Sequence, residues 1–455
     1  MSRGGSWFPR VLLFCVVMYA SVILFWSARN FGAFNVLEAT SSGHFQEQQL
    51  SILISQDTSM ADFPSGDTKI REVRCITWRS TRECSPEGPR QPTMDRNCTD
   101  IIPAGQSGYC EVEDVSSEKR FRMMKLHCNS IRRGVPFRCS DAQKFVDFRA
   151  QAYVTMKMAL SSEFLLPNVL KSTTTTADGI VMVVYPKLLA SAYATISVLR
   201  LVFRCQLPIE IWFRPDEMKS NEILIPLRRR AASESNITFQ EIHDPLAKRF
   251  VAKVYAIYHS SFDRILFLDA DNVPVRDPSY LFASLEFVRT GAVFWPDFWH
   301  PSSTIFNIHK TSLLWELLDT PFVDMFEQES GQLMIDRRRH AIPLELVRFY
   351  ASCPDIFSSL KLTWGDKDLF RFAWLKLEVP FHMIQTPPGM AGVIIDSSLT
   401  SVFCGMTMVQ HDTNGGILFL HRNHQKLSGS SQLMDIRTYS NALDSHGNNY
   451  PDPAI

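Results

Sequence analysis

The sequence predicts an α/β domain that follows an N-terminal membrane anchor and a small cysteine-rich module. Three features predict this: an apolar run near the N-terminus, cysteines crowded into one segment, and apolar runs that alternate between strand-like and helix-like spacing. The chain has 455 residues, enough for about two or three domains. Lys plus Arg and Asp plus Glu number 47 each, so no net charge attracts nucleic acid, and we expect no nucleic-acid partner.

The apolar run over 11–28 contains no charged residue and follows Arg3 and Arg10. A transmembrane helix needs about 20 apolar residues to cross a hydrocarbon core, and short spans suit the thinner early-secretory membranes. A cleaved signal peptide is the alternative, but this run is longer than a typical signal core and is followed by bulky and charged residues. We therefore expect a cytoplasmic tail over 1–10 and a signal anchor over 11–28.

Residues 29–70 are rich in Ser, Gln, Gly and Thr and show little hydrophobic periodicity, which predicts a stem. The next segment, 71–147, carries a density of cysteines typical of an oxidising compartment. Several pairings are possible and the sequence does not choose among them; a zinc module is the alternative, but the chain has no Cys-x-x-Cys pair. We expect a disulfide module made by Cys75, Cys84, Cys98, Cys110, Cys128 and Cys139. The Asn-x-Thr sequons at Asn97 and Asn236 agree with a lumenal body.

From residue 179 the apolar pattern becomes that of an α/β domain. Strand and helix spacing alternate, which predicts a sheet with parallel strand order. Ligands of such sheets bind outside the carboxyl ends of the strands, and Asp269 and Asp271 directly follow the third predicted strand. The predicted elements are strands at 179–185, 209–213 and 264–268 and helices at 188–203 and 245–259.

Asp269 and Asp271 are two carboxylates close in sequence, and they repel each other unless a cation offsets their charge. Mg²⁺ and Mn²⁺ accept oxygen ligands, and substrate phosphates often complete their coordination. The pair therefore favours a divalent ion and a substrate that carries a diphosphate. Taken alone, an Asp-x-Asp pair is more often a solvated turn, so the surrounding sequence has to decide between the two.

That surrounding sequence is Ser261-Phe-Asp-Arg-Ile-Leu-Phe-Leu-Asp-Ala-Asp-Asn-Val-Pro-Val-Arg-Asp-Pro. With it, the chain over roughly 179–426 resembles the Golgi α-mannosyltransferases of glycosyltransferase family 71, of the fungal α-1,3-mannosyltransferase type, in the nucleotide-diphospho-sugar transferase superfamily. Further matching blocks are Leu207-Pro-Ile-Glu-Ile-Trp, Thr290-Gly-Ala-Val-Phe-Trp-Pro-Asp-Phe-Trp, Glu329-Ser-Gly-Gln-Leu-Met-Ile-Asp, Gly365-Asp-Lys-Asp-Leu-Phe and Phe419-Leu-His-Arg-Asn with Lys426.

The resemblance implies a catalytic domain of the GT-A fold over 170–426, which leaves 427–455 as a C-terminal tail. It also implies a GDP-mannose donor, a divalent Mn²⁺ or Mg²⁺ ion, retention of anomeric configuration, and a mannose-containing glycan acceptor in protein glycosylation. Such enzymes are single-pass type II proteins of the Golgi membrane, with a lumenal catalytic domain. We expect the same of this chain.

The resemblance also implies roles for single residues, and each role has a plainer alternative. Asp269 and Asp271 would bind the metal with His421, which is otherwise a structural histidine with His411 and His424 as competitors. Asp366 and Asp368 would be the catalytic carboxylates facing the sugar, unless they only stabilise a helix N-terminus. The predicted donor-binding residues, which are otherwise core, loop or surface positions, are Lys253, Trp295, Asp297, Glu329, Gly331, Gln332, Arg422 and Lys426.

Three other functions compete with this prediction. A related transferase could use a UDP-sugar, because a fold does not fix the donor. An inactive relative could bind glycans without turnover, although the chain keeps both aspartates, His421 and Lys426. A metal-dependent hydrolase is the third, but the sequence has no His-Glu-x-x-His or Gly-x-Ser-x-Gly motif.

Overall fold

The computed structural model describes residues 60–66, 70–169, 176–218, 224–233, 236–363, 365–396, 401–422 and 426–427. The predicted cytoplasmic tail, the signal anchor, most of the stem and nearly all of the C-terminal tail lie outside these residues. Within the described residues, no helix has both the length and the apolar character needed to span a bilayer.

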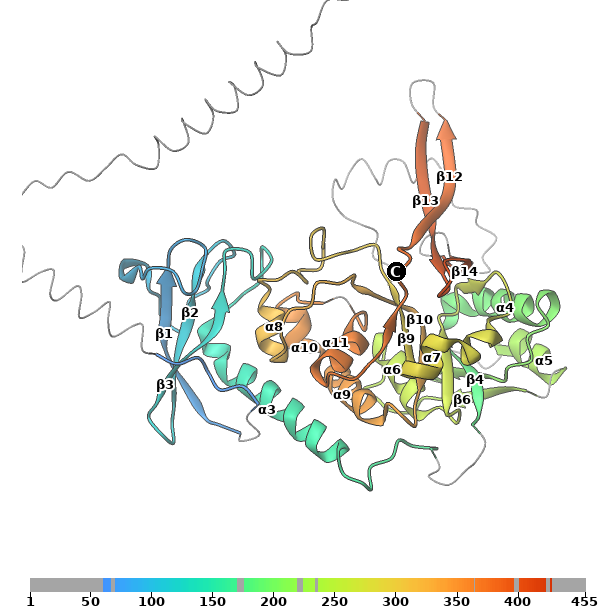
Figure 1. Cartoon of the computed structure of the whole chain (residues 1–455), viewed down its shortest axis with the longest axis horizontal. Coiled ribbons are helices and arrows are strands. Elements are labelled where there is room, and N and C mark those ends of the chain that lie inside the picture. The colour runs from blue at the N-terminus through green and yellow to red at the C-terminus, as the bar shows by residue number, and fades with distance from the viewer. Residues whose placement is uncertain are drawn as a thin grey trace, which may run out of the picture. The chain divides into compact units, whose positions relative to one another are not determined.

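The first described elements form a three-stranded antiparallel sheet in the order β1-β2-β3 (Figure 1). These strands are β1 (Val73–Thr81), β2 (Ser107–Asp114) and β3 (Arg120–Leu126). All six cysteines of the segment are paired, which confirms the expected disulfides and excludes a zinc site built from them. The bridges are Cys75–Cys98, Cys84–Cys128 and Cys110–Cys139.

Helix α3 (Ala142–Ala159) leads from this sheet to the next domain and packs against both. Its Phe148 stacks on Tyr350 of α9 (Ala341–Ser352), with ring centroids 5.9 Å apart. Trp78 of β1 and Phe294 in the large sheet belong to the same buried apolar cluster. The cysteine-rich segment therefore shares a continuous core with the α/β domain.

The α/β domain contains a seven-stranded sheet in the order β11-β9-β10-β7-β4-β5-β6. Strands β6, β5, β4 and β7 are parallel, which confirms the predicted order for this half. The strands are β4 (Asp178–Val184), β5 (Ile209–Phe213), β6 (Ile237–Glu241), β7 (Arg264–Leu268), β9 (Ala292–Pro296), β10 (Gln328–Asp336) and β11 (His382–Met383).

Strand β10 is antiparallel to both of its neighbours, so the sheet is mixed rather than wholly parallel. The chain leaves β9 at Asp297 and returns to the same edge of the sheet at Glu327, where the Asp297 N–H donates to the Glu327 carbonyl at 2.7 Å. A strand that enters from the edge where its neighbour ended must run in the opposite direction. The sequence did not predict this reversal.

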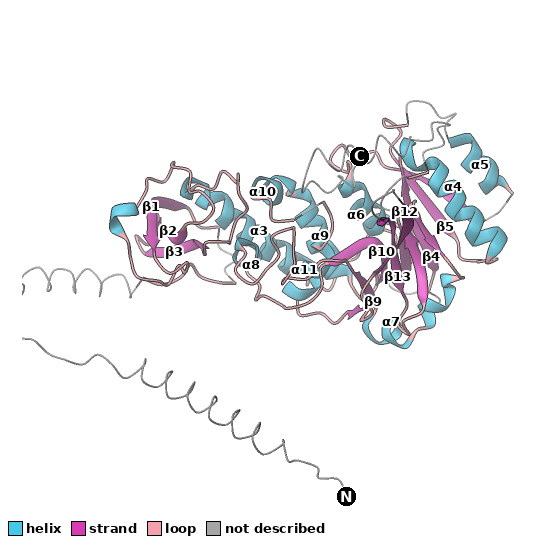
Figure 2. Cartoon of the chain, turned by 90° about the horizontal axis from the view of Figure 1, so that it is seen from above, coloured by secondary structure: helices cyan, strands magenta, loops and turns pink. Residues whose placement is uncertain are grey.

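Helices cover both faces of the sheet, as expected for an α/β fold (Figure 2). Alternate residues of β4 face opposite layers: Val181 belongs to one apolar cluster, Ile180 and Met182 to the other. The remaining helices are α4 (Leu189–Ser197), which continues as a π-helix to Val202, α5 (Ile225–Ala232), α6 (Phe250–His259), α7 (Leu285–Thr290), α8 (Leu313–Leu318), α10 (Pro354–Ser359) and α11 (Leu369–Lys376). Short 3₁₀ turns lie at Pro92–Met94, Cys139–Asp141, Pro186–Leu188 and Pro278–Ala283.

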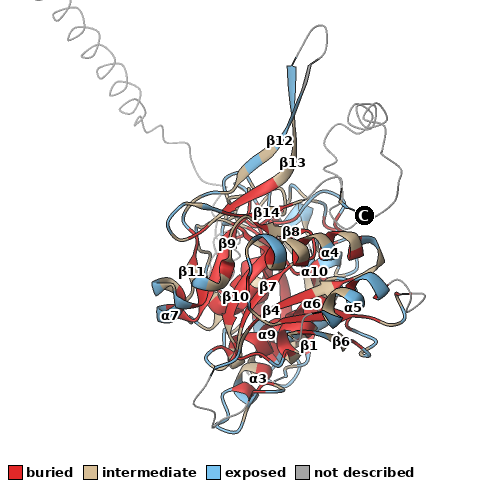
Figure 3. Ribbon diagram, turned by 90° about the vertical axis from the view of Figure 1, so that its right-hand side faces the viewer, coloured by how far each residue is buried: buried red, intermediate tan, exposed pale blue. Residues whose placement is uncertain are grey.

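A smaller sheet, in the order β12-β13-β14-β8, lies beside the large one. Strand β8 (Asn272–Pro274) follows Asp271 directly and pairs with β14 (Ile417–His421), so that Asn272 and His421 are opposite each other. The hairpin of β12 (Gly389–Asp396) and β13 (Ser401–His411) projects from the body, while the large sheet is buried (Figure 3). The small sheet thus brings a segment distant in sequence to the carboxyl end of β7.

Candidate metal and donor site

Three predicted metal ligands meet at the carboxyl end of β7. Asp269, Asp271 and His421 each offer a ligand atom, and these atoms all lie within 4.8 Å of one another. The Asn272 N–H donates to the Asp269 carbonyl at 2.9 Å, and the Arg422 N–H donates to the Asp271 carbonyl at 3.1 Å. The turn after β7 and the end of β14 are therefore tied to each other by backbone hydrogen bonds. The side chain of Asp269 is 26% exposed, whereas that of Asp271 is buried.

Basic groups surround these carboxylates. His421 Nε2 lies 3.5 Å from Asp271 Oδ1, and Lys426 Nζ lies 2.8 Å from Asp271 Oδ2. Lys253 on α6 is buried, with its Nζ 3.2 Å from both Asp269 Oδ2 and Asp366 Oδ2. Lys253 is therefore not an exposed surface lysine of the helix, which was the alternative to a role at the site.

The donor set of two carboxylates and one imidazole fits a divalent metal ion. Carboxylate oxygens suit Mg²⁺ and Mn²⁺, and an imidazole nitrogen favours the transition metal of the two. Asp269 is partly exposed beside two buried partners, so the site has one accessible side. A diphosphate could complete the coordination from that side.

The ionisable groups of the site strongly shift one another's pKa values. Burial would lower the pKa of His421, but Asp271 and Glu329 raise it to about 10. Burial would raise the pKa of Glu329, but His421 and Lys253 lower it to about 2. The pKa of Asp271 is likewise lowered by His421 and Lys426 against the effect of its burial. In this arrangement the carboxylates and the imidazole hold each other in their charged forms.

A second buried cluster, formed around Lys367, lies next to the metal cluster. Lys367 Nζ is 2.8 Å from Asp297 Oδ2 and also pairs with Glu327. Burial raises the pKa of Asp297 to about 6, with Lys367 opposing and Glu329 adding to the rise. Asp368 accepts hydrogen bonds from Arg371 Nε at 2.9 Å and from the backbone N–H of residue 328 at 2.8 Å. Asp368 therefore connects α11 to β10.

The other predicted donor-binding residues divide between core and site. Trp295 is completely buried, and its Nε1 donates to the His411 carbonyl at 2.8 Å, so its surroundings are those of a core residue. Gln332 is also buried, and its Oε1 accepts from Asn272 Nδ2 at 2.5 Å. His411 is not part of the metal-ligating group, and His424 lies outside the described residues.

Several residues of the site were missed by the sequence reasoning. Tyr185 directly follows β4. Burial raises the pKa of its hydroxyl, the charge of Lys426 opposes the rise and that of Asp271 adds to it, so Tyr185 lies near the metal cluster. Its place at a strand end was the signal that could have identified it. Lys367 lies inside a matching block, but its burial among acids depends on the loop between β9 and β10.

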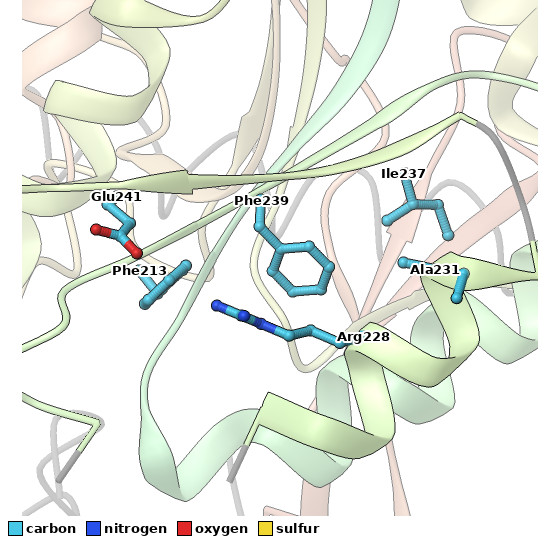
Figure 4. A pocket seen from close by; sticks show the side chains of 7 residues that line it. Phe213, Arg228, Ala231, Ile237, Phe239 and Glu241 are labelled. Carbon is cyan, nitrogen blue, oxygen red and sulfur yellow. The ribbon is translucent and has the colours of Figure 1, made fainter. Parts of the chain in front are cut away.

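A cavity of about 390 Å³ lies away from this cluster, on the β6 side of the large sheet (Figure 4). Arg228 of α5 lies over the ring of Phe239, 5.5 Å from its centroid. The lining residues are Phe213, Arg228, Ala231, Ala232, Ile237, Phe239 and Glu241. None of them was predicted as a site residue.

Comparison with known proteins gives a match over the α/β domain. The model of the Mannosyl_trans3 mannosyltransferase family matches residues 177–412. Alpha-1,2-mannosyltransferase MNN2 of Saccharomyces cerevisiae is 29% identical over 284 residues, 54% of this chain and 44% of that protein. Probable alpha-1,3-mannosyltransferase MNT4 of the same yeast is 26% identical over 295 residues, 54% of this chain and 49% of that protein. The matches span less than half the length of these curated relatives.

Solved structures give weaker matches. The mannosyltransferase Ktr4p of S. cerevisiae has 11% identity and a TM-score of 0.32, covering 50% of this chain and 74% of that one. Core-mannan synthase A of Aspergillus fumigatus, in an Mn/GDP form, has 9% identity and a TM-score of 0.31, covering 47% of this chain and 73% of that one. TM-scores this low do not identify a fold.

Proposed function

The chain belongs to the Mannosyl_trans3 family of mannosyltransferases, and from this membership we propose that it moves mannose from GDP-mannose to a mannose-containing glycan. One observation carries the proposal: Asp269, Asp271 and His421 meet at the carboxyl end of a strand, with ligand atoms within 4.8 Å. Relatives named as α-1,2- and probable α-1,3-mannosyltransferases support mannose as the sugar and one of these two linkages as the product.

We assign the domain to the GT-A fold. Four parallel strands with helices on both faces support this assignment, because ligands of such sheets bind outside the carboxyl ends of the strands, which are here β4 and β7. Tyr185 and Lys253 lie beside the metal cluster at that edge of the sheet, where Tyr185 is half-buried and Lys253 is buried. A nucleotide bound there would direct its diphosphate at Asp269 and Asp271.

When bound, a divalent ion, Mn²⁺ or Mg²⁺, supplies Lewis-acid stabilisation of the departing diphosphate. Lys426 lies on the Asp271 side of the cluster, and its ammonium adds positive charge where the diphosphate would leave. Arg422, one residue after His421, adds a second basic side chain to that segment. These groups favour the transition state because the negative charge on the diphosphate grows as the sugar bond breaks.

Asp366 is our candidate for the carboxylate that stabilises the reacting sugar. Its Oδ2 lies 3.2 Å from Lys253 Nζ, and this lysine also contacts Asp269, so Asp366 belongs to the same charged layer as the metal ligands. Asp368 contacts Arg371 instead and acts as a positioning residue between α11 and β10. Asp297, directly after β9, is our remaining acidic candidate for the donor, whereas Gln332 is buried and hydrogen-bonded to Asn272 and supports the turn that carries Asp271.

We also propose a single-pass type II protein of the Golgi membrane with a lumenal catalytic domain. The apolar run over 11–28 supports the membrane anchor. The three disulfides support an oxidising compartment, since such bridges are rare in the cytosol.

The test is transfer by the purified full-length protein with Mn²⁺, a mannoside acceptor and labelled GDP-mannose, UDP-glucose or UDP-galactose. We expect transfer from GDP-mannose only, and a loss of at least about 100-fold in Asp269→Asn and Asp271→Asn. Asp277→Asn is the matched control, because Asp277 follows in the same segment but caps a 3₁₀ turn through Ser279. Glycan binding without transfer from any donor would instead identify an inactive glycan-binding relative.

A further inference from the structure

Strand β10 lies against the proposed metal site through its segment 329–331. This segment contacts His421 and the turn that carries Asp269 and Asp271. The Gly331 carbonyl accepts the Asp269 N–H at 2.8 Å and Asn272 Nδ2 at 2.9 Å. These two hydrogen bonds hold both ends of the turn that carries Asp269 and Asp271. The backbone of Gly331 therefore fixes the position of two ligands.

The third ligand, His421, lies against the same glycine. A Cβ atom at Gly331 would lie 2.6 Å from His421 Nδ1, 2.7 Å from His421 Cε1 and 3.0 Å from Glu329 Oε1. Distances this short are not tolerated, so any side chain at this position would displace the imidazole ring. Close packing of His421 on the strand therefore explains why residue 331 is a glycine, without a contact between Gly331 and the donor.

Glu329 contacts the opposite side of the imidazole from Asp271. Its Oε1 accepts the Gly331 N–H at 2.6 Å and lies 3.5 Å from His421 Nδ1, which is an ion-pair distance, while His421 Nε2 lies 3.5 Å from Asp271 Oδ1. Among the described residues the buried Nδ1 has no hydrogen-bond partner, and Glu329 is the carboxylate that faces it. The glutamate side chain is 14% exposed. A histidine that binds a metal through one nitrogen commonly donates its other N–H to a carboxylate, which fixes the tautomer and the orientation of the ring.

We propose that Glu329 is a positioning residue for the metal site: its carboxylate holds the Nδ1–H of His421, so that Nε2 is presented to the metal beside Asp271. Gly331 provides the space in which the ring takes this orientation. The inference rests on the proposed function, because it requires a metal bound by Asp269, Asp271 and His421. It assigns Glu329 and Gly331 to the metal site rather than to direct binding of the donor.

The test is Mn²⁺ binding by the full-length protein, measured by titration calorimetry without donor. We expect Glu329→Gln, which keeps the size of the side chain but loses its charge, to weaken Mn²⁺ binding by about 10- to 100-fold. The matched control is Glu327→Gln two residues earlier, whose carboxylate contacts Lys367 and should leave Mn²⁺ affinity unchanged. Thermal unfolding of each variant checks that it is folded.

Gly331→Ala is a second variant that acts on the same ring by a different route, and we expect it to weaken Mn²⁺ binding as well. Its control is Gly389→Ala on β12, where a Cβ atom would have its nearest neighbour at an ordinary 3.4 Å. For Glu329→Gln, saturating Mn²⁺ should restore the KM for GDP-mannose, because only the metal affinity has been changed.

The outcomes separate the two proposals. Unchanged Mn²⁺ affinity in Glu329→Gln, together with a raised KM that excess Mn²⁺ does not correct, would mean direct donor contact and overturn the positioning role. If the unmodified protein binds Mn²⁺ and neither Asp269→Asn nor Asp271→Asn changes the affinity, the proposed metal site itself is overturned, and the inference with it.

Discussion

Replacing Lys367 with methionine removes the ammonium group that lies among three buried carboxylates. Asp297 Oδ2 is 2.8 Å from Lys367 Nζ, Glu327 is in direct contact with it, and Asp368 Oδ2 is 3.8 Å away. At an effective dielectric constant of about 20, Lys367 and Asp297 at 2.8 Å attract each other by about 6 kcal/mol, before the cost of removing both charges from water. Methionine matches the length of the lysine stem, so the change removes charge with little change in packing.

Loss of one partner from a buried ion pair typically costs about 3–5 kcal/mol. We expect Lys367→Met to lower the free energy of unfolding by that amount at pH 8, measured by urea titration with tryptophan fluorescence. Lys361→Met is the control, because Lys361 is exposed and its replacement should cost within about 0.5 kcal/mol.

The cost should depend on pH in a defined direction. The folded-state pKa of Asp297 is raised to about 6, above its unfolded value, so its contribution to stability is present at low pH and is lost as pH rises through about 6. Without the positive charge of Lys367, the pKa values of the neighbouring carboxylates should rise further, so that they bind protons more readily at low pH. We expect a smaller destabilisation at pH 5 than at pH 8. A loss below about 1 kcal/mol at pH 8, or an equal loss at both pH values, would refute this account of the cluster.

Two further predictions concern stability away from the site. Burial would raise the pKa of Asp319, but hydrogen bonds from the Tyr153 and Ser65 hydroxyls lower it, and the nearby charges of Arg149 and Lys376 add to this. Asp319→Asn should cost about 2 kcal/mol at pH 7, and the difference from the unmodified protein should shrink below about pH 4 in urea unfolding. The Cys84–Cys128 bridge closes a 44-residue separation, so Cys84→Ser with Cys128→Ser should cost about 4 kcal/mol by loop entropy, and an unchanged urea midpoint would contradict that estimate.

The strands that carry the site could be predicted because each is a short apolar run. Strands β5 and β7 begin and end where the pattern predicts, and the match to the Mannosyl_trans3 family confirms the resemblance to α-mannosyltransferases. The predicted helix over 245–259 begins only at Phe250, and β6 and α5 were missed. In β6 the central residues are partly exposed, so its apolar signal is weak.

The side-chain environments could not be predicted, because they depend on how distant segments meet. His421 was expected as a metal ligand, but its contact with Glu329 requires β14 of the small sheet to approach β10 of the large sheet. The burial of Lys367 depends on the return of the chain to the edge of β9, which also reverses β10. No local pattern encodes either arrangement.

The most direct test of the account is a crystal structure of the protein with Mn²⁺ and GDP, with an anomalous difference map to locate the metal. The account predicts a single strong manganese peak among Asp269, Asp271 and His421 Nε2, with diphosphate oxygens on its open side. A manganese peak elsewhere, or GDP bound without a metal at these three residues, would contradict it.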